Sequence, residues 1–431
     1  MARYADLSKA ELEEELTRVR ERYAELQARD LALNMARGKP SQAQLDLSMP
    51  LLDVLDAEAD FCSEDGTDCR NYGVLDGIPE AKRLMATLLD DEPDNVIVLG
   101  NASLTAMYDA MVRYWMFGAL GSTPWGRLDT VKWLCPVPGY DRHFTICEAL
   151  GIEMIPVPMS DEGPDMDEVE RLVAADPAIK GIWCVPKYSN PSGITYADDV
   201  VRRLASMDTA ASDFRIFWDN AYAVHHLSAD PAEQDTVLDI AQACAEADNP
   251  DRYLKFGSTS KITFPGAGVA AVAASPANVA EIKRHMNAQA IGHDKLNQLR
   301  HARFLDEGRG IAAHMARHGE LMKPKFDLVC AKLEEELGEA GVARWTSPRG
   351  GYFISFEGPE GTAARIVALA KEAGVVMTSA GATWPYGNDP VDSNIRIAPS
   401  LPPLEELDEA MDVFTCCVKL AALEKLAEEN A

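Results

Sequence analysis

The sequence predicts an α/β protein: a large domain with a mostly parallel sheet of the seven-stranded type, covered by helices, and a small α+β domain formed by both termini. Between about residues 70 and 275, short apolar runs alternate with amphipathic helical stretches. Continuous apolar strands separated by helices indicate a parallel sheet that is buried on both faces. After about residue 276 the chain becomes helical and then mixed. With 431 residues, of which 47% are hydrophobic, it is long enough to bury a large core.

The first predicted element is an amphipathic helix at residues 8–29. A Ser8-x-x-Glu11 capping box opens it. Apolar side chains then recur three and four residues apart, as one face of a helix requires: Leu12, Leu16, Val19, Tyr23 and Leu26. We expect this helix to pack on its own protein or on a second subunit.

The remaining elements follow from the same periodicities. In the middle of the chain we expect strands at 96–99, 131–134, 153–157, 181–185, 215–218 and 269–272, and helices near 79–90, 103–117, 141–150, 165–175 and 198–206. Further on, we expect helices at 277–290, 295–317, 320–338, 361–373 and from 403, and strands at 351–356, 375–377 and 394–398. The large domain should span residues 61–300, and the small domain should combine residues 1–60 with 301–431.

The net charge and the cysteine content limit the classes of function that the sequence allows. Forty-one basic residues against sixty-nine acidic ones give a net charge of −28, which argues against binding to nucleic acid or to anionic membranes. The nine cysteines are odd in number and form no Cys-x-x-Cys pair, so we expect free thiols in a reducing cytosol and neither a disulfide frame nor a metal site. The sequence has no signal-peptide pattern and no apolar window of about 18 residues, so we expect a cytoplasmic protein.

A lysine among small residues is the first candidate for chemistry. Lys261 lies within residues 257–268, between serine and threonine hydroxyls and a Pro-Gly turn. Such surroundings leave room for an amine that bonds covalently to a carbonyl ligand. On its own the pattern is a weak signal, because most lysines are solvated surface charges.

Four further features follow predicted strands. A glycine turn runs into a helix at Ala102, Ser103 and Leu104, which favours either a phosphate site or an ordinary helix cap. Asp219 follows a buried strand, where a carboxylate needs a cationic partner, such as a protonated pyridine, unless it caps a helix. The last two lie in turns: Asn190 in an Asn-Pro turn, and Tyr140, which is either a core residue or a ring that stacks on a planar ligand.

The order and spacing of these features resemble the fold type I pyridoxal-phosphate enzymes, specifically the class I aminotransferases, over roughly residues 30–400. The chain looks most similar to a divergent bacterial aspartate aminotransferase subgroup. The motifs that carry this resemblance are Asn-Tyr-Gly-Val-Leu-Asp-Gly at 71–77, Ser-Lys-Ile-Thr-Phe-Pro-Gly-Ala-Gly at 260–268 and Asn-Ile-Arg-Ile-Ala-Pro-Ser at 394–400. The resemblance implies a transaminase that uses pyridoxal 5'-phosphate and exchanges an amino group between an amino acid, with aspartate favoured, and 2-oxoglutarate by a ping-pong mechanism.

The resemblance also implies a role for each site residue. Lys261 forms the Schiff base with the cofactor aldehyde and moves the substrate proton, and Asp219 pairs with the pyridine nitrogen. Tyr222 and Asn190 bond the ring hydroxyl oxygen, and Tyr140 stacks on the ring. The remaining implied contacts are to the phosphate, through Ala102, Ser103, Leu104 and Ser258 and through Tyr72 of a neighbouring subunit in a homodimer, and to the substrate α-carboxylate, through Arg396 and the closing loop at Gly38.

Two points stay open at this level. Family members carry a phosphate-binding arginine seven or eight residues after the lysine, where this chain has Gly268 and Val269. A dicarboxylate substrate also needs a second cation, for which Arg37, Arg142 and Lys295 are unranked candidates. Alternative functions are an aminotransferase of broad, alanine, aromatic or kynurenine specificity, a pyridoxal-phosphate lyase, and a non-catalytic pyridoxal-phosphate sensor.

Overall fold

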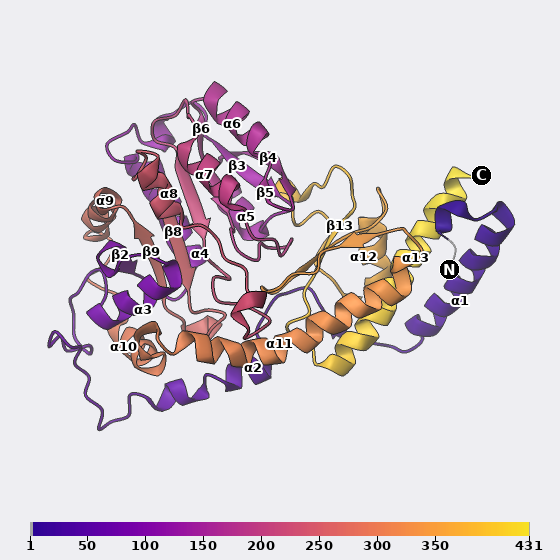
Figure 1. Cartoon of the computed structure of the whole chain (residues 1–431), viewed down its shortest axis with the longest axis horizontal. Coiled ribbons are helices and arrows are strands. Elements are labelled where there is room, and N and C mark those ends of the chain that lie inside the picture. The colour runs from indigo at the N-terminus through magenta and orange to yellow at the C-terminus, as the bar shows by residue number, and fades with distance from the viewer. Residues whose placement is uncertain (1–2, 431) are drawn as a thin grey trace.

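A computed structural model describes residues 3–430 of the chain. It confirms the predicted fold class, because a large sheet lies between helices and a long helix leads from it to a smaller group of elements (Figure 1). The strand order of the large sheet is β2-β9-β8-β7-β6-β3-β4-β5. Its strands are β2 (Val96–Val98), β3 (Lys132–Val137), β4 (Glu153–Ser160), β5 (Gly163–Pro164), β6 (Ile179–Cys184), β7 (Arg215–Asp219), β8 (Tyr253–Ser258) and β9 (Ala270–Ala274).

Most of the sheet is parallel. The neighbouring strands β8, β7, β6, β3 and β4 all run in one direction, and β9 pairs antiparallel with β8 and with β2. Within the described residues, the two-residue β5 adds an eighth strand to the predicted seven by folding back on the end of β4. Parallel strands bring their carboxyl ends to one edge of the sheet, so residues that follow β6, β7 and β8 lie near one another.

Helices bury both faces of the sheet. α4, α5 and α9 pack on one apolar core, in which Trp133 lies against Trp183 and Phe217 at ring-centroid distances of 5.4 and 5.1 Å. α6, α7 and α8 pack on a second core, and α3 packs with α10 on a third. The helices are α3 (Pro79–Leu89), α4 (Ser103–Phe117), α5 (Asp141–Ala149), α6 (Met166–Ala175), α7 (Asp198–Ser206), α8 (Ile240–Glu246), α9 (Pro276–Met286) and α10 (Lys295–Phe304).

Two elements, β8 and α8, were not predicted from the sequence. β8 is interrupted by Lys255, a charge that breaks the apolar pattern from which strands were predicted. Lys255 is nonetheless buried, because its Nζ lies 3.2 Å from an oxygen of Asp91 and 2.6 Å from an oxygen of Asp239. Two carboxylates thus offset the cost of burying the ammonium group in the strand.

The predicted helices at 295–317 and 320–338 are divided at the wrong place. The chain instead breaks between α10 and α11 (Ile311–Leu333), and α11 continues into a π turn at Glu334–Gly338. Gly308 lies in the break with a φ of 101°, and a Cβ there would lie 2.6 Å from Thr87 Oγ1. Since only glycine adopts this conformation readily, the helix ends here rather than near residue 318.

The smaller group of elements combines the two ends of the chain, as predicted. α1 (Lys9–Gln27) lies beside α13 (Leu404–Glu429), and Figure 1 shows both ends of the chain on this side. α12 (Ala363–Glu372) and α11 share the same apolar core. A parallel pair of β1 (Leu33–Asn34) with β12 (Val375–Val376) and an antiparallel sheet of β10 (Arg344–Trp345), β11 (Ile354–Glu357) and β13 (Asn394–Ile397) complete it. The domain boundaries at 60 and 300 remain predictions.

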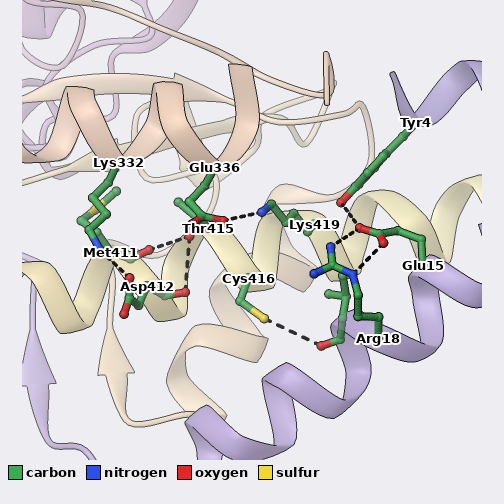
Figure 2. Close-up of polar contacts among 11 residues, drawn as sticks. Tyr4, Glu15, Arg18, Lys332, Glu336, Met411, Asp412, Thr415, Cys416 and Lys419 are labelled. Carbon is green, nitrogen blue, oxygen red and sulfur yellow. Dashed lines mark hydrogen bonds and ion pairs between the residues drawn. The ribbon is translucent and has the colours of Figure 1, made fainter. Parts of the chain in front are cut away.

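Polar contacts border the packing of α1, α11 and α13 (Figure 2). Glu15 accepts hydrogen bonds from Arg18 and from the Tyr4 hydroxyl, and Lys419 of α13 pairs with Glu336 just beyond α11. Lys332 Nζ lies 2.7 Å from Asp412 Oδ1. These pairs lie at the edge of the apolar core that the three helices share, and Lys419 is itself buried.

The cysteines are free thiols, as predicted. Burial raises the pKa of the Cys244 thiol to about 12, so it stays protonated and unreactive. Across residues 3–430, no helix is long and apolar enough to cross a bilayer.

Candidate active site

One cavity of about 520 Å³ brings together six of the predicted site residues: Gly38, Tyr140, Asn190, Tyr222, Lys261 and Arg396. They come from segments far apart in the sequence. Asn190 follows β6, Tyr222 follows β7 and Lys261 follows β8, at the carboxyl edge of the parallel strands. Arg396 lies in β13, so the cavity lies where the large sheet meets the smaller group of elements.

Asp219 is the last residue of β7 and is almost wholly buried. Its Oδ2 accepts a hydrogen bond from His143 Nε2 at 3.0 Å, and the His143 ring stacks on Trp183 at 4.4 Å. Its Oδ1 is buried without a hydrogen-bond partner among the described residues. A buried carboxylate oxygen without a donor is costly, so Oδ1 fits a ligand that brings an N–H group.

His143 was not predicted as a site residue. It lies in the first turn of α5, three residues after Tyr140, and its ring meets the edge of Tyr140 at 4.9 Å. The sequence contains the spacing but not the contact, because Asp219 lies on a strand 76 residues away along the chain.

Lys261 is positioned as a reactive amine. Its Nζ lies 4.7 Å from the centroid of the Tyr222 ring and makes no hydrogen bond or ion pair with any residue that the structure describes. Burial lowers the pKa of Lys261, and the negative charge of Asp219 opposes part of that effect. A lowered pKa increases the fraction of neutral amine, which is the nucleophilic and basic form.

Tyr222 is buried beside this amine. Burial raises the pKa of Tyr222 well above its ordinary value, and the nearby Tyr140 and Asp219 add to the effect. Burial likewise raises the pKa of Tyr140 to about 12. Both hydroxyls are therefore protonated at neutral pH and can donate hydrogen bonds to a ligand oxygen.

Arg396 is held by three neighbours. Its Nη1 lies 3.0 Å from Asp141 Oδ1 and donates to Asn190 Oδ1 at 3.3 Å, and its guanidinium carbon lies 4.8 Å from the centroid of the Phe353 ring. Its Nε is buried without an acceptor within residues 3–430. A guanidinium with unused N–H groups at a cavity wall is suited to bind a carboxylate through two hydrogen bonds.

Gly38 is required by the same aromatic ring. A Cβ at this position would lie 2.5 Å from Phe353 Cζ, closer than such atoms approach. The main chain of the loop can thus reach the ring that stacks on Arg396 only without a side chain.

The predicted phosphate residues lie beside the cavity and do not line it. Ala102 is the N-cap of α4 and Ser103 its first residue, and no side chain within the described residues caps this helix. Ser258 donates to Ser260, whose hydroxyl in turn donates to the carbonyl of Asn101 at 3.3 Å. The start of α4 and a pair of serine hydroxyls therefore lie close together, and the N-terminus of a helix favours an anion. Leu104 lies in the same first turn.

The absent arginine has a steric explanation at the first of the two positions. A Cβ on Gly268 would lie 3.0 Å from the Asn101 carbonyl oxygen and 3.2 Å from Thr259 Oγ1. Val269 is buried in the apolar core of α3 and α10. The structure thus leaves little room for a side chain at 268 and directs 269 into the core.

Of the three candidate cations and Tyr72, two line the cavity and two do not. Arg37 and Arg142 line the cavity with Arg396. Lys295 does not, since its buried Nζ donates to the carbonyl of Gly73 at 2.9 Å. Tyr72 is 83% exposed on that same segment and outside the cavity.

Histidines not predicted from the sequence support the lysine segment. His225 Nε2 lies 3.3 Å from the carbonyl oxygen of Lys261, and His314 Nε2 of α11 lies 2.8 Å from that of Ile262. Burial lowers the pKa of both rings. Neutral imidazoles can donate one N–H each to these carbonyls, which fixes the main chain around Lys261.

Comparison with known proteins identifies the family. The sequence model of the family described as aspartate amino-transferase matches residues 7–430. A protein of Mycolicibacterium smegmatis is 53% identical over 406 residues, 94% of either chain, and an aspartate aminotransferase of Corynebacterium glutamicum is 48% identical over 410 residues, 95% of this chain and 94% of the relative. The crystal structure of an aspartate transaminase from Corynebacterium glutamicum matches with a TM-score of 0.95 and 46% identity over 98% of this chain and 99% of that chain. The chain therefore belongs to the aspartate aminotransferase family of transaminases.

Proposed function

We propose that this aminotransferase uses pyridoxal 5'-phosphate to transfer the amino group of aspartate to 2-oxoglutarate in two successive half-reactions. The observation that carries the proposal is that three groups lie close together. Lys261 and Arg396 line one cavity, and Asp219, whose Oδ1 has no partner among the described residues, lies near enough to Lys261 to affect its pKa. An amine, a buried anion and a carboxylate-binding cation match what this chemistry requires.

The residues present fit the cofactor. Lys261 would hold its aldehyde, Asp219 Oδ1 would accept the N–H of the pyridinium ring, and Tyr222 with Asn190 would donate to the ring hydroxyl oxygen. Tyr140 would cover one face of the ring. When bound, pyridoxal phosphate supplies an electron sink for the bond that breaks at the substrate α-carbon.

The phosphate would lie at the first turn of α4, where Ala102, Ser103 and Leu104 supply main-chain N–H groups and Ser258 a hydroxyl. These donors would take over from the arginine that is absent at Gly268. We propose that Tyr72, which is exposed outside this site, reaches the phosphate of a partner subunit in a homodimer.

Protein groups would perform the acid–base chemistry. Lys261 would act as the base that accepts the α-proton of the substrate on its Nζ, and it would later give that proton up. Its lowered pKa increases the fraction of the neutral amine, which is the basic form. Asp219 would lie between the His143 N–H and the ring nitrogen, and Arg396 would hold the α-carboxylate so that the α-proton lies within reach of the amine.

Arg37 and Arg142 support the dicarboxylate preference. Both lie in the wall of the cavity that contains Arg396, so a substrate bound at Arg396 can direct a second carboxylate to either. The relative from Corynebacterium glutamicum is named for the same substrate, aspartate. Lys295 is excluded as a reader of the substrate side chain within one subunit, because its ammonium group is buried against Gly73.

The test is an assay of purified protein loaded with pyridoxal phosphate. Aspartate and 2-oxoglutarate should give equal amounts of oxaloacetate and glutamate, without release of carbon dioxide. Activity with alanine or aromatic amino acids alone would contradict the aspartate assignment, and carbon dioxide release would indicate a lyase. If Arg37→Gln and Arg142→Gln both leave the ratio of the rate with aspartate to the rate with alanine unchanged, neither arginine binds the second carboxylate.

A further inference from the structure

We propose that Asp141 occupies the position on Arg396 at which the substrate carboxylate binds. Substrate must displace Asp141 from Arg396, so Asp141 lowers the affinity of the site for carboxylates. The inference rests on the proposed function, in which Arg396 binds the α-carboxylate. It concerns a residue that neither the motifs nor the family roles above involve.

The contact is a direct ion pair inside the cavity. Asp141 Oδ1 lies 3.0 Å from Arg396 Nη1, and both residues line the cavity with Lys261. The Arg396 side chain is 7% exposed, whereas that of Asp141 is 36% exposed. The anion is therefore the partner with access to water, and it is the one that can leave.

The pairing leaves the guanidinium incompletely used. Asp141 contacts Nη1 alone, the same nitrogen that donates to Asn190, and Arg396 Nε is buried without an acceptor among residues 3–430. A substrate carboxylate that binds the fork through two nitrogens would gain a hydrogen bond that Asp141 does not make. Substrate can thus displace the aspartate.

The carboxylates of Asp141 and of the substrate would repel each other if both were bound to the Arg396 guanidinium. Asp141 makes no other ion pair within the part of the chain that the structure describes, so Arg396 is its one partner there. Asp141 is the first residue of α5, directly after Tyr140, and this place in the helix keeps its carboxylate close to Arg396. The free site therefore holds an internal competitor whose removal should strengthen binding of any carboxylate.

The consequence concerns selectivity. A ligand with one carboxylate must displace Asp141 with the energy of that group alone. A dicarboxylate gains a second anchor at the cavity wall, where Arg37 and Arg142 lie, and can displace the aspartate more readily. Asp141 thus disfavours small monocarboxylates.

The experiment measures binding of maleate, a dicarboxylate without an amino group, to the holoenzyme by isothermal titration calorimetry. Asp141→Asn removes the charge at nearly constant shape, and Asp141→Glu retains it. Glu148→Gln is the matched control, because Glu148 is an exposed acid on the same helix outside the cavity. Thermal melting verifies that each variant is folded.

Asp141→Asn should bind maleate about ten-fold more tightly than the unchanged protein. Asp141→Glu and Glu148→Gln should stay within about two-fold of it. Affinity that is unchanged in Asp141→Asn, or weaker because Asp141 orients Arg396 for the substrate, would overturn the inference.

If neither the unchanged protein nor Asp141→Asn binds maleate, Arg396 does not bind carboxylates and the inference fails. The transaminase assay gives a separate answer, because it follows products and not binding. A protein that transaminates aspartate but shows no gain of affinity in Asp141→Asn would refute the inference alone.

Discussion

Asp219 Oδ2 lies 3.0 Å from His143 Nε2, and both side chains are almost wholly buried. The histidine occupies one carboxylate oxygen and leaves the other without a partner among the described residues. This division orients the carboxylate so that one oxygen is available to a cationic ring nitrogen. We therefore expect His143 to position Asp219, a contact that the sequence alone did not indicate.

Asp219→Asn should lower kcat by about 100- to 1000-fold, because a neutral amide cannot stabilise a protonated ring nitrogen. His143→Gln retains a donor near Asp219 and should cost about ten-fold. Steady-state rates with aspartate and 2-oxoglutarate measure both. A larger loss for His143→Gln than for Asp219→Asn would contradict the assigned order of importance.

Arg396→Lys should lower kcat/KM for aspartate by about 100-fold, since an ammonium group cannot bind a carboxylate through two parallel hydrogen bonds. The loss should appear for every amino-acid substrate, because all share the α-carboxylate. Arg37→Lys, a conservative change in the cavity wall, serves as the comparison. A loss confined to dicarboxylic substrates would instead assign Arg396 to the second carboxylate.

Gly38→Ala should destabilise the loop by about 1–3 kcal/mol and lower kcat/KM, because the new Cβ would overlap the Phe353 ring. Phe353→Leu makes room for it at the cost of the stacking on Arg396. The double variant should therefore recover thermal stability relative to Gly38→Ala, without full recovery of activity. If Gly38→Ala alone melts and turns over like the unchanged protein, the loop does not depend on this contact.

Lys325 gives a prediction about pH. Its buried Nζ donates to the carbonyl of Ser400, and Ser400 Oγ donates to the carbonyl of Lys39 in the loop beside Gly38. Burial lowers the pKa of Lys325 from 10.5 to about 8. Between these values the unfolded chain binds more protons than the folded one, so this residue's contribution to the free energy of unfolding rises as pH increases.

Lys325→Met removes this titration. The free energy of unfolding of the unchanged protein, relative to Lys325→Met, should rise by on the order of 2 kcal/mol between about pH 8 and pH 10.5, the range bounded by the folded and unfolded pKa values. Urea denaturation across that range measures it. A difference between the two proteins that does not change with pH would show that Lys325 titrates normally.

The sequence was sufficient for the fold class and for Lys261, Asn190 and Tyr140 as candidates, because apolar strands and strand-end motifs are local patterns. Tyr222, Arg396 and Gly38 were predicted through the family resemblance.

The sequence was insufficient where one residue depends on another far along the chain. Lys255 interrupts β8 and is held there by Asp239 and, far along the chain, by Asp91 and the carbonyl of Asp90. The pairing of Asp141 with Arg396 likewise depends on how the two groups of elements pack together.

The ranking of the cations shows the same limit. The sequence does not distinguish Arg37, Arg142 and Lys295 as candidates. Only the packing shows that both arginines line the cavity, whereas the lysine is bound to the carbonyl of Gly73. The break before α11 was misplaced for a related reason, since Gly308 is needed against the distant Thr87.

The central claim is that Lys261 carries the cofactor. Reduction of the holoprotein with borohydride, followed by proteolysis and mass spectrometry, fixes the cofactor on whichever lysine bears it. The account predicts a phosphopyridoxyl group on Lys261, and none on Lys261→Ala treated in parallel. Attachment at another lysine such as Lys187 or Lys255, or an unchanged extent of labelling in Lys261→Ala, would contradict it.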